Sequence, residues 1–217
     1  MKANVHPSPW SGDRNREREI KRDAVLRAAA QAFNENGFHA TSLDDVARRL
    51  NVTKPTLYYY VKSKNEILFE CVRIALEMLK AAIDEAGAAK GSALDKLTLA
   101  MRKYVGIVTT DFGMCLIRIG EDPLPSESRK KLRGLKAGVD RELRRLISQG
   151  IAEGSLAPCD PKMAAFTLAG ALSWIGRWYR PDGPLTPDEI AAHCLAVLMN
   201  GVSKRVRSQK TLTGSRP

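Results

Sequence analysis

Apolar residues recur along the chain at intervals of three and four, which is the pattern of amphipathic helices. From Val25 to Phe33 they keep this spacing within a first helix that we predict over residues 20–36. Gly37 follows, at the position where a helix end favours a left-handed backbone. The alternation of apolar and polar residues that is typical of strands is hard to find. The pattern therefore predicts an all-helical protein.

Two shorter helices follow the first. Ser42 precedes Asp45 by three residues, which is close to a capping box and predicts a helix over residues 43–50. Thr53 is placed to cap a third helix whose first turn contains Pro55, where proline is tolerated. Two short helices joined by so tight a turn form a helix-turn-helix.

Six further helices are predicted, which makes about nine in all. Their expected ranges are 63–86, 92–110, 113–120, 128–153, 162–179 and 187–205. Residues 163–176 are apolar on nearly every side, so this helix should be covered all round, either by a partner chain or as the central helix of a monomer.

We divide the chain into four parts. Residues 1–15 are a basic tail that does not order by itself, and residues 16–64 are a helix-turn-helix head. Residues 65–205 are a body for ligand binding and dimerisation, and residues 206–217 are a second basic tail.

The positive charge lies at the two ends of the chain. The formal net charge is +11, yet residues 65–203 are nearly neutral, with 18 Lys and Arg against 17 Asp and Glu. Residues 1–64 hold 12 Lys and Arg against 7 acids, and residues 204–217 hold 5 against none. A basic head on a neutral body favours a polyanion as partner, although basic surfaces are often only solvated.

Several classes of protein are disfavoured by what the sequence lacks. The four cysteines are far apart, without zinc-ligand spacing, and we expect reduced thiols, no metal and no cofactor. The three histidines are scattered, and no catalytic arrangement or phosphate-binding loop stands out, so we expect no enzyme. No stretch approaches the ~18 apolar residues of a membrane span, and we expect a cytoplasmic protein without membrane association.

The stretch TKPTLYYYVKSK, residues 53–64, carries three consecutive tyrosines. With Leu57 at 0° on a helical wheel, Val61 falls at about 40° and Tyr59 at about 200°, opposite the face that these two apolar residues define. Tyr58 and Tyr60 fall to either side and can be boundary core residues. Tyr59 is thus expected to be exposed without a packing reason. A DNA major groove would cover it, because a recognition helix meets base edges with its first turn.

This interpretation gives a set of expected DNA contacts. Lys54 is placed to donate to guanine, Pro55 to touch a thymine methyl, and the hydroxyl groups to position the helix on the backbone. Lys64 adds charge for another phosphate. Ser42 and Thr53 are first of all helix caps. The full set is Ser42, Thr53, Lys54, Pro55, Thr56, Tyr58, Tyr59, Tyr60 and Lys64.

The segment AAAQAFNENGFHATSLDDVARRLNVTKPTLYYYVKSKNEIL resembles the DNA-binding head of the tetracycline-repressor (TetR) family of bacterial transcription regulators, over about residues 18–70. The resemblance implies an all-helical homodimer that joins through its last two long helices, here about 162–179 and 187–205. Two related recognition helices would then read an inverted repeat with half-sites about one DNA turn (~34 Å) apart. Asn51 replaces the usual turn glycine, and Asp44 stands where some members read a base, so no base contact is assigned to it.

The family also implies a ligand that releases the repressor from its operator. The segment GALSWIGRWYRPDGPLTPDEIA resembles members that control fatty-acid, acyl-CoA or steroid breakdown. Aromatic rings and arginines suit a hydrophobic anion, although such residues are more often core or dimer interface. The candidate effector residues are Tyr104, Val108, Phe112, Cys115, Arg118, Trp174, Arg177 and Trp178. The alternative is a DNA-binding regulator or architectural protein without a small-molecule effector.

Overall fold

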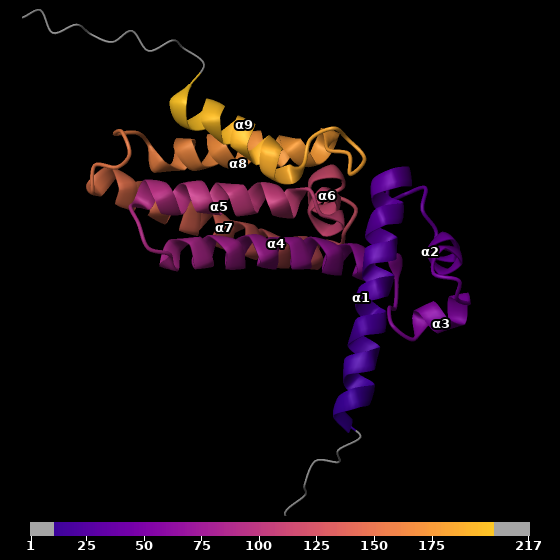
Figure 1. Ribbon diagram of the computed structural model, residues 1–217. Helices are drawn as coiled ribbons and strands as arrows, with labels where there is room; N and C mark the ends of the chain where they lie inside the picture. The colour runs from indigo at the N-terminus through magenta and orange to yellow at the C-terminus, as the bar shows by residue number, and fades with distance from the viewer. Residues whose placement is uncertain (1–10, 202–217) are drawn as a thin grey trace, which may run out of the picture.

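All regular structure in residues 11–201, which the computed structural model describes with side chains from residue 14 on, is helical (Figure 1). The helices are α1 (Ser11–Asn36), α2 (Leu43–Arg49), α3 (Lys54–Tyr58), α4 (Lys64–Ala88), α5 (Ala93–Val108), α6 (Asp111–Arg118), α7 (Ser126–Ala152), α8 (Pro161–Trp178) and α9 (Pro187–Asn200). The all-α fold and the approximate position of each predicted helix are confirmed.

Short polar side chains start most of these helices. Ser42 and Asp45 form a complete capping box at α2, as predicted, and Thr53 accepts a hydrogen bond from the backbone N–H of Thr56 at the start of α3. Ser63 caps α4 in the same way. Such caps satisfy backbone donors that have no partner inside the helix, so they fix where each helix begins.

Two predicted boundaries are wrong. The first helix begins at Ser11, so residues 11–15, which we assigned to an unordered tail, are helical. The last helix ends at Asn200, because Gly201 leaves the helical conformation with φ of 73°; residues 202–205, to which we extended it, lie outside the described residues. The remaining tail predictions, for residues 1–10 and 206–217, lie outside the described residues.

The first three helices form the head (Figure 1). α1 crosses the end of the helical body steeply, and α2 and α3 lie together on its outer side. Asn51, in the turn between α2 and α3, has φ of 53°, the left-handed conformation that a glycine would adopt easily and that asparagine tolerates. The turn therefore keeps the geometry of a helix-turn-helix without its usual glycine.

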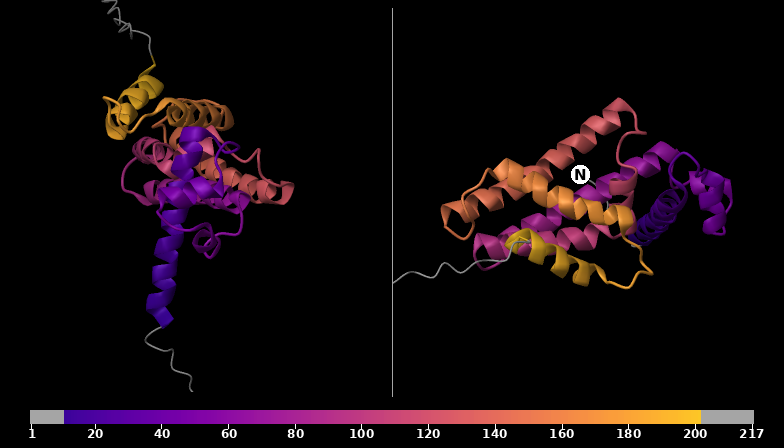
Figure 2. Two further views of the ribbon diagram at one scale, coloured as in Figure 1. Left: turned by 90° about the vertical axis from the view of Figure 1, so that its right-hand side faces the viewer. Right: turned by 90° about the horizontal axis from the view of Figure 1, so that it is seen from above.

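α4 leads from the head into the body and packs against α1, α5, α6 and α7. α5 is the central helix, in contact with α4, α6, α7, α8 and α9. α8 and α9 form one outer side of the body, as the views of Figure 2 show. One apolar cluster extends from Val25 in α1 to Leu195 in α9, so head and body share a continuous core.

α8 is not covered all round within one chain. Met163, Phe166, Trp174 and Trp178 expose between 49% and 65% of their surface. The monomer interpretation, in which α8 is a central core helix, is therefore wrong, because α5 has that position instead. Within residues 11–201, no helix is both long and apolar enough to cross a membrane.

Candidate nucleic-acid interface and ligand cavities

The outer surface of α3 carries the predicted DNA contacts. Leu57 is fully buried and Val61 is 1% exposed, whereas Tyr59 is 66% exposed. Although α3 ends at Tyr58, Tyr59 keeps helical backbone angles (φ −66°, ψ −28°), so the helical wheel still places its ring correctly. Tyr58 is half exposed and Tyr60 packs partly against the core, as expected for flanking positions. We call the exposed residues Lys54, Pro55, Thr56, Tyr58 and Tyr59 the recognition face.

Lys54 forms an ion pair across the helix-turn-helix. Its Nζ donates to Oδ2 of Asp44 at 2.8 Å, and this hydrogen bond raises the pKa of Lys54. Both side chains are about half exposed. Next to this pair, the hydroxyl groups of Thr53 and Thr56 lie 2.8 Å apart, so both are partly engaged within the helix start. The exposed ammonium of Lys54 therefore has the Asp44 carboxylate beside it.

Lys64, a predicted phosphate contact, makes its hydrogen bonds within the head. Its ammonium donates to the backbone carbonyls of Phe38, His39 and Thr41 at 2.9, 3.4 and 3.0 Å, and it lies 4.5 Å from the centre of the Phe38 ring. The three N–H donors of the Lys64 ammonium are thus all used within the head. The side chain joins the loop between α1 and α2 to the start of α4, a structural role that the sequence did not suggest.

Sequence reasoning missed a residue next to the recognition face. The guanidinium of Arg18, in the early part of α1, lies 5.3 Å from the centre of the Tyr59 ring. The helical wheel could not show this contact, because Arg18 lies in α1 before the segment that we predicted as helical.

A cavity of about 420 Å³ opens between four helices of the body; we call it the bundle cavity. Its wall is mainly apolar, with two cations near it. It is lined by Leu76 of α4, Leu116 and Ile117 of α6, Lys136 of α7, and Gly170, Ser173, Trp174 and Arg177 of α8. Lys136 is also paired with Glu121 at 3.0 Å. A ligand that combines an apolar part with an anionic group fits this arrangement.

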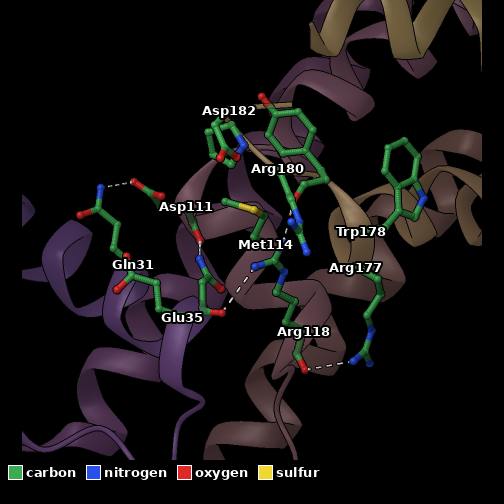
Figure 3. A pocket seen from close by; sticks show the side chains of 12 residues that line it. Gln31, Glu35, Asp111, Met114, Arg118, Arg177, Trp178, Arg180 and Asp182 are labelled. Carbon is green, nitrogen blue, oxygen red and sulfur yellow. Dashed lines mark hydrogen bonds between the residues drawn. The ribbon is translucent and has the colours of Figure 1, made fainter. Parts of the chain in front are cut away.

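A second cavity, of about 570 Å³, lies where the head meets the body; we call it the junction cavity (Figure 3). α1 contributes Gln31, Asn34 and Glu35, and α6 contributes Asp111, Met114 and Arg118. The remaining wall comes from the end of α8 and the loop after it, residues 177–182. Its lining is more polar than that of the bundle cavity, with three arginines and three acids.

Hydrogen bonds across the junction cavity join α6 to both of its neighbours. Gln31 of α1 donates to the Asp111 carboxylate at 2.9 Å (Figure 3). Arg118 donates to the carbonyl oxygens of Gly176 and Tyr179, each at 2.8 Å. Partial burial, followed by the charge of Arg177, lowers the pKa of Arg118. α6 is therefore fixed to α1 at one end and to the end of α8 at the other.

The predicted effector residues separate into two groups. Trp174 and Arg177 line the bundle cavity, while Arg118, Arg177 and Trp178 line the junction cavity. The other four are buried in the packed interior and line neither cavity: Tyr104, Val108, Phe112 and Cys115.

Tyr104 comes nearest to a cavity among these four, because its hydroxyl lies 2.8 Å from that of Ser173, a bundle-cavity residue. Burial raises the pKa of Tyr104. Cys115 instead faces Cys71 of α4, and a hydrogen bond between the thiols, together with burial, raises the pKa of Cys71 well above its usual value. Sequence reasoning missed Leu76, Ile117 and Lys136, because no local signal shows that three different helices meet around one space.

Residues 25–71 match the family described as bacterial regulatory proteins of the tetR family, and residues 90–202 match the tetracyclin repressor-like C-terminal domain. The chain belongs to the TetR family. It is therefore a DNA-binding transcriptional regulator. The resemblance noted in the sequence is confirmed, over more of the chain than the head alone.

Individual TetR-family proteins align over most of the chain. The HTH-type transcriptional repressor KstR2 of Mycolicibacterium smegmatis is 25% identical over 194 residues, covering 85% of this chain and 91% of KstR2. The crystal structure of PfmR from Thermus thermophilus has a TM-score of 0.76 and 30% identity, with 83% of this chain and 99% of PfmR covered. A complex of AibR with isovaleryl coenzyme A and operator DNA shares the fold, with a TM-score of 0.72, 24% identity, and coverage of 81% and 96%.

Proposed function

We propose that this TetR-family protein is a dimeric repressor that binds an inverted-repeat operator through the recognition face and leaves it when a hydrophobic anion enters the body. The observation that carries the proposal is the exposure of Tyr59 beside Lys54, Pro55 and Thr56. A large ring that is 66% exposed on a short helix is covered only when another molecule lies against it. KstR2, which aligns over most of the chain, is a repressor by name.

The partner chain is proposed to cover α8 and α9. Four large apolar side chains of α8 are exposed, and Val197 of α9 is 50% exposed. On a helical wheel the four α8 residues fall within an arc of about 120°, and α8 and α9 lie on the same outer side of the body (Figure 2). Contiguous exposed apolar area of this kind marks an interaction site, and a two-fold axis places the same surface on both chains. Two recognition faces then reach successive major grooves.

The effector is proposed to occupy the bundle cavity, and its class to be an acyl-CoA thioester or a related hydrophobic anion. Leu76, Leu116 and Ile117 would cover the acyl chain, while Lys136 and Arg177 would meet the anionic part. The anion would compete with Glu121 for Lys136, since these two side chains are paired. AibR supports this class, because the same fold holds isovaleryl coenzyme A together with operator DNA.

α6 is the proposed link between ligand and DNA. Leu116 and Ile117 line the bundle cavity, while Asp111, one end of the same helix, accepts hydrogen bonds from α1. A ligand that shifts α6 would therefore move α1 and the head. In a dimer, this changes the distance between the two recognition faces and weakens operator binding.

The division into a head of residues 16–64 and a body of residues 65–205 fits this scheme, with α4 passing from one to the other. We place the protein in the cytoplasm, with operator DNA.

Selection from random double-stranded DNA tests the DNA part. The expected product is an inverted repeat with half-site centres about one helical turn apart. Tyr59→Ala should weaken binding to the selected site by about tenfold, whereas Leu185→Ala, which truncates an exposed apolar residue in the loop before α9, should leave it unchanged. If the selection enriches no sequence and Tyr59→Ala binds DNA like wild type, the proposal is wrong.

Operator release tests the effector part. Fluorescence anisotropy of labelled operator is followed while acyl-CoA thioesters of increasing chain length, or the corresponding free acids, are added. Lys136→Ala should require at least tenfold more thioester for the same release. Lys130→Ala removes the same charge from an exposed position of α7 outside the cavity and should respond like wild type. Release by no thioester or acid of any length would remove this effector class and leave DNA binding intact.

A further inference from the structure

The early part of α1 extends beyond the rest of the head. Residues 14–21 are exposed at every position, and burial begins only near Val25. Figures 1 and 2 show this part of the helix passing α3 and continuing away from the body. A helical segment that covers no core gains nothing from packing, although the ion pair between Glu17 and Lys21 at 2.5 Å helps to hold its helical form.

Four of the five cations on residues 14–22 lie on one side of the helix. With Arg14 at 0° on a helical wheel, Arg18 falls at about 40°, Arg22 at about 80° and Lys21 at about 340°, so these four cations share an arc of about 100°. Glu17 and Glu19 fall outside this arc, at about 300° and 140°, and the fifth cation, Arg16, falls outside it at about 200°. We call the arc the basic stripe. An ordinary solvated helix surface would mix the two signs around its circumference.

The basic stripe adjoins the recognition face. Arg18 lies over the exposed ring of Tyr59, with 5.3 Å between its guanidinium carbon and the ring centre. Lys21 lines a shallow apolar groove together with Thr56 and Tyr60. Arg14 is one helical turn before Arg18 on the same side, about 6 Å further along α1. The surface that faces DNA in the proposed complex therefore continues from α3 onto α1.

Two cations of the stripe remain for an outside partner. Arg22 is paired with Glu66 and Glu70, at 3.3 and 3.5 Å, and Lys21 is paired with Glu17. Among the described residues, no ion pair includes Arg14 or Arg18. Arginine at such positions suits phosphate, which it can bind through two parallel hydrogen bonds.

The direction of α1 determines which part of the DNA duplex the basic stripe would contact. α8 and α9, which join the two chains in the proposed dimer, lie on the opposite side of the molecule from the beginning of α1 (Figures 1 and 2). The projecting segments thus point away from the two-fold axis. The backbone of α1 continues seven residues before Arg18, about 10 Å, which corresponds to roughly three base pairs.

We propose that Arg14 and Arg18 bind the phosphate backbone of DNA outside each half-site of the operator, and so extend the binding site by about three base pairs at both ends without reading their sequence. This inference rests on the proposed function. It adds a second protein surface, on α1, to the contact made by α3.

Two duplex probes test the proposal. One ends at the outer edges of the selected inverted repeat, and the other carries five further base pairs of arbitrary sequence at each end. Wild type should bind the longer probe about tenfold more tightly. Arg14→Ala/Arg18→Ala should bind both probes equally, and on the longer probe its log–log salt slope should fall by about 2 to 4, one phosphate for each lost arginine in a dimer.

Matched variants separate a local contact from net charge. Arg133→Ala/Arg141→Ala removes two exposed cations of α7 in the body and should keep the full preference for the longer probe. Arg14→Ala alone, which leaves the Arg18–Tyr59 contact untouched, should lose part of the preference, and Arg14→Lys/Arg18→Lys should retain most of it. Equal binding of both probes by wild type would overturn the inference while DNA binding itself stands. Binding of neither probe would instead defeat the proposed function.

Discussion

The ammonium of Lys54 lies 2.8 Å from the Asp44 carboxylate, so the first turns of α2 and α3 present a lysine and an acid side by side. The charge of Lys54, which the sequence predicts to contact guanine, is therefore partly balanced by the Asp44 carboxylate in the absence of DNA. A guanine–cytosine pair offers two acceptors and one amino donor in the major groove, which is the pattern that a lysine next to a carboxylate can meet. We therefore propose that Asp44, to which the sequence assigned no contact, contacts DNA together with the recognition face.

Asp44→Ala should raise affinity for DNA of arbitrary sequence and lower the preference for the operator. Removing the carboxylate relieves repulsion from phosphates and frees Lys54 to bind any of them. The log–log salt slope should steepen by about 1 to 2 for a dimer, since each chain gains one free cation. Anisotropy titrations on operator and on unrelated duplex, over a series of salt concentrations, measure both quantities. Unchanged binding to unrelated duplex would show that Asp44 does not restrain Lys54.

Lys54→Ala should reduce the binding preference for the correct base pair at one operator position by roughly 1–3 kcal/mol, because a lost contact to guanine acts at one base pair only. Selected sequences from wild type and variant are compared position by position. Lys62→Ala is the control, since Lys62 is exposed near the end of the same segment but outside the recognition face. A variant whose sequence preference matches wild type at every position would remove Lys54 as a base reader.

Lys64→Ala should destabilise the head. It should not act as the loss of a single phosphate contact, which would weaken binding to every DNA sequence alike. Hydrogen bonds from a charged group contribute about 1.5–3 kcal/mol, and three carbonyls lose their donor here, so the free energy of unfolding should fall by about 1–3 kcal/mol. Urea unfolding followed by circular dichroism measures this value, with Lys62→Ala expected to stay near wild type. A stable Lys64→Ala protein with a lower salt slope would restore the phosphate contact that the sequence suggested.

The different outcomes for Tyr59 and Lys64 show what sequence can and cannot give. The exposure of Tyr59 follows from its angle relative to Leu57 and Val61 on one helix, which is a local property. The partners of Lys64 are carbonyls 23 to 26 residues earlier, in a loop whose path depends on how α1 and α2 pack. The bundle cavity is harder still to predict from the sequence, because its wall combines side chains from four helices. Predicted helices and caps were accordingly accurate, whereas half of the predicted effector residues lie in packed core.

Asp95 should make the stability of the body depend on pH. Its carboxylate accepts hydrogen bonds from the Ser92 hydroxyl and backbone N–H at the start of α5, and these bonds lower the pKa of Asp95. A lowered pKa in the folded state means that the stabilisation is complete above the unfolded value of about 4 and is lost as pH falls through the folded value. Urea midpoints of wild type and Asp95→Asn should therefore differ at pH 7 and converge below about pH 4. A gap between wild type and Asp95→Asn that stays constant down to low pH would contradict the linkage.

Gly113 and Gly106 should respond oppositely to alanine. A Cβ on Gly113 would overlap the Ile107 carbonyl oxygen and lie 2.6 Å from the Val108 Cα, backbone atoms that cannot move aside without displacing α6 from α5. Gly113→Ala should therefore lower the free energy of unfolding by about 2–3 kcal/mol, as overpacking does in a close-packed interior. At Gly106, in the interior of α5, a Cβ meets nothing within 4 Å, so Gly106→Ala should raise stability by about 0.5–1 kcal/mol through lower chain entropy when unfolded.

Since α6 also holds α1 through Asp111, the Gly113→Ala protein that remains folded should bind operator less tightly at equal concentration of folded dimer. Urea unfolding and operator anisotropy on both variants separate these effects. If Gly113→Ala unfolds within about 0.5 kcal/mol of wild type (a limit set by the usual scatter of surface substitutions), α6 does not pack against α5 as closely as the structure shows. If it unfolds early yet binds operator normally once folded, the link from α6 to the head is wrong while the packing holds.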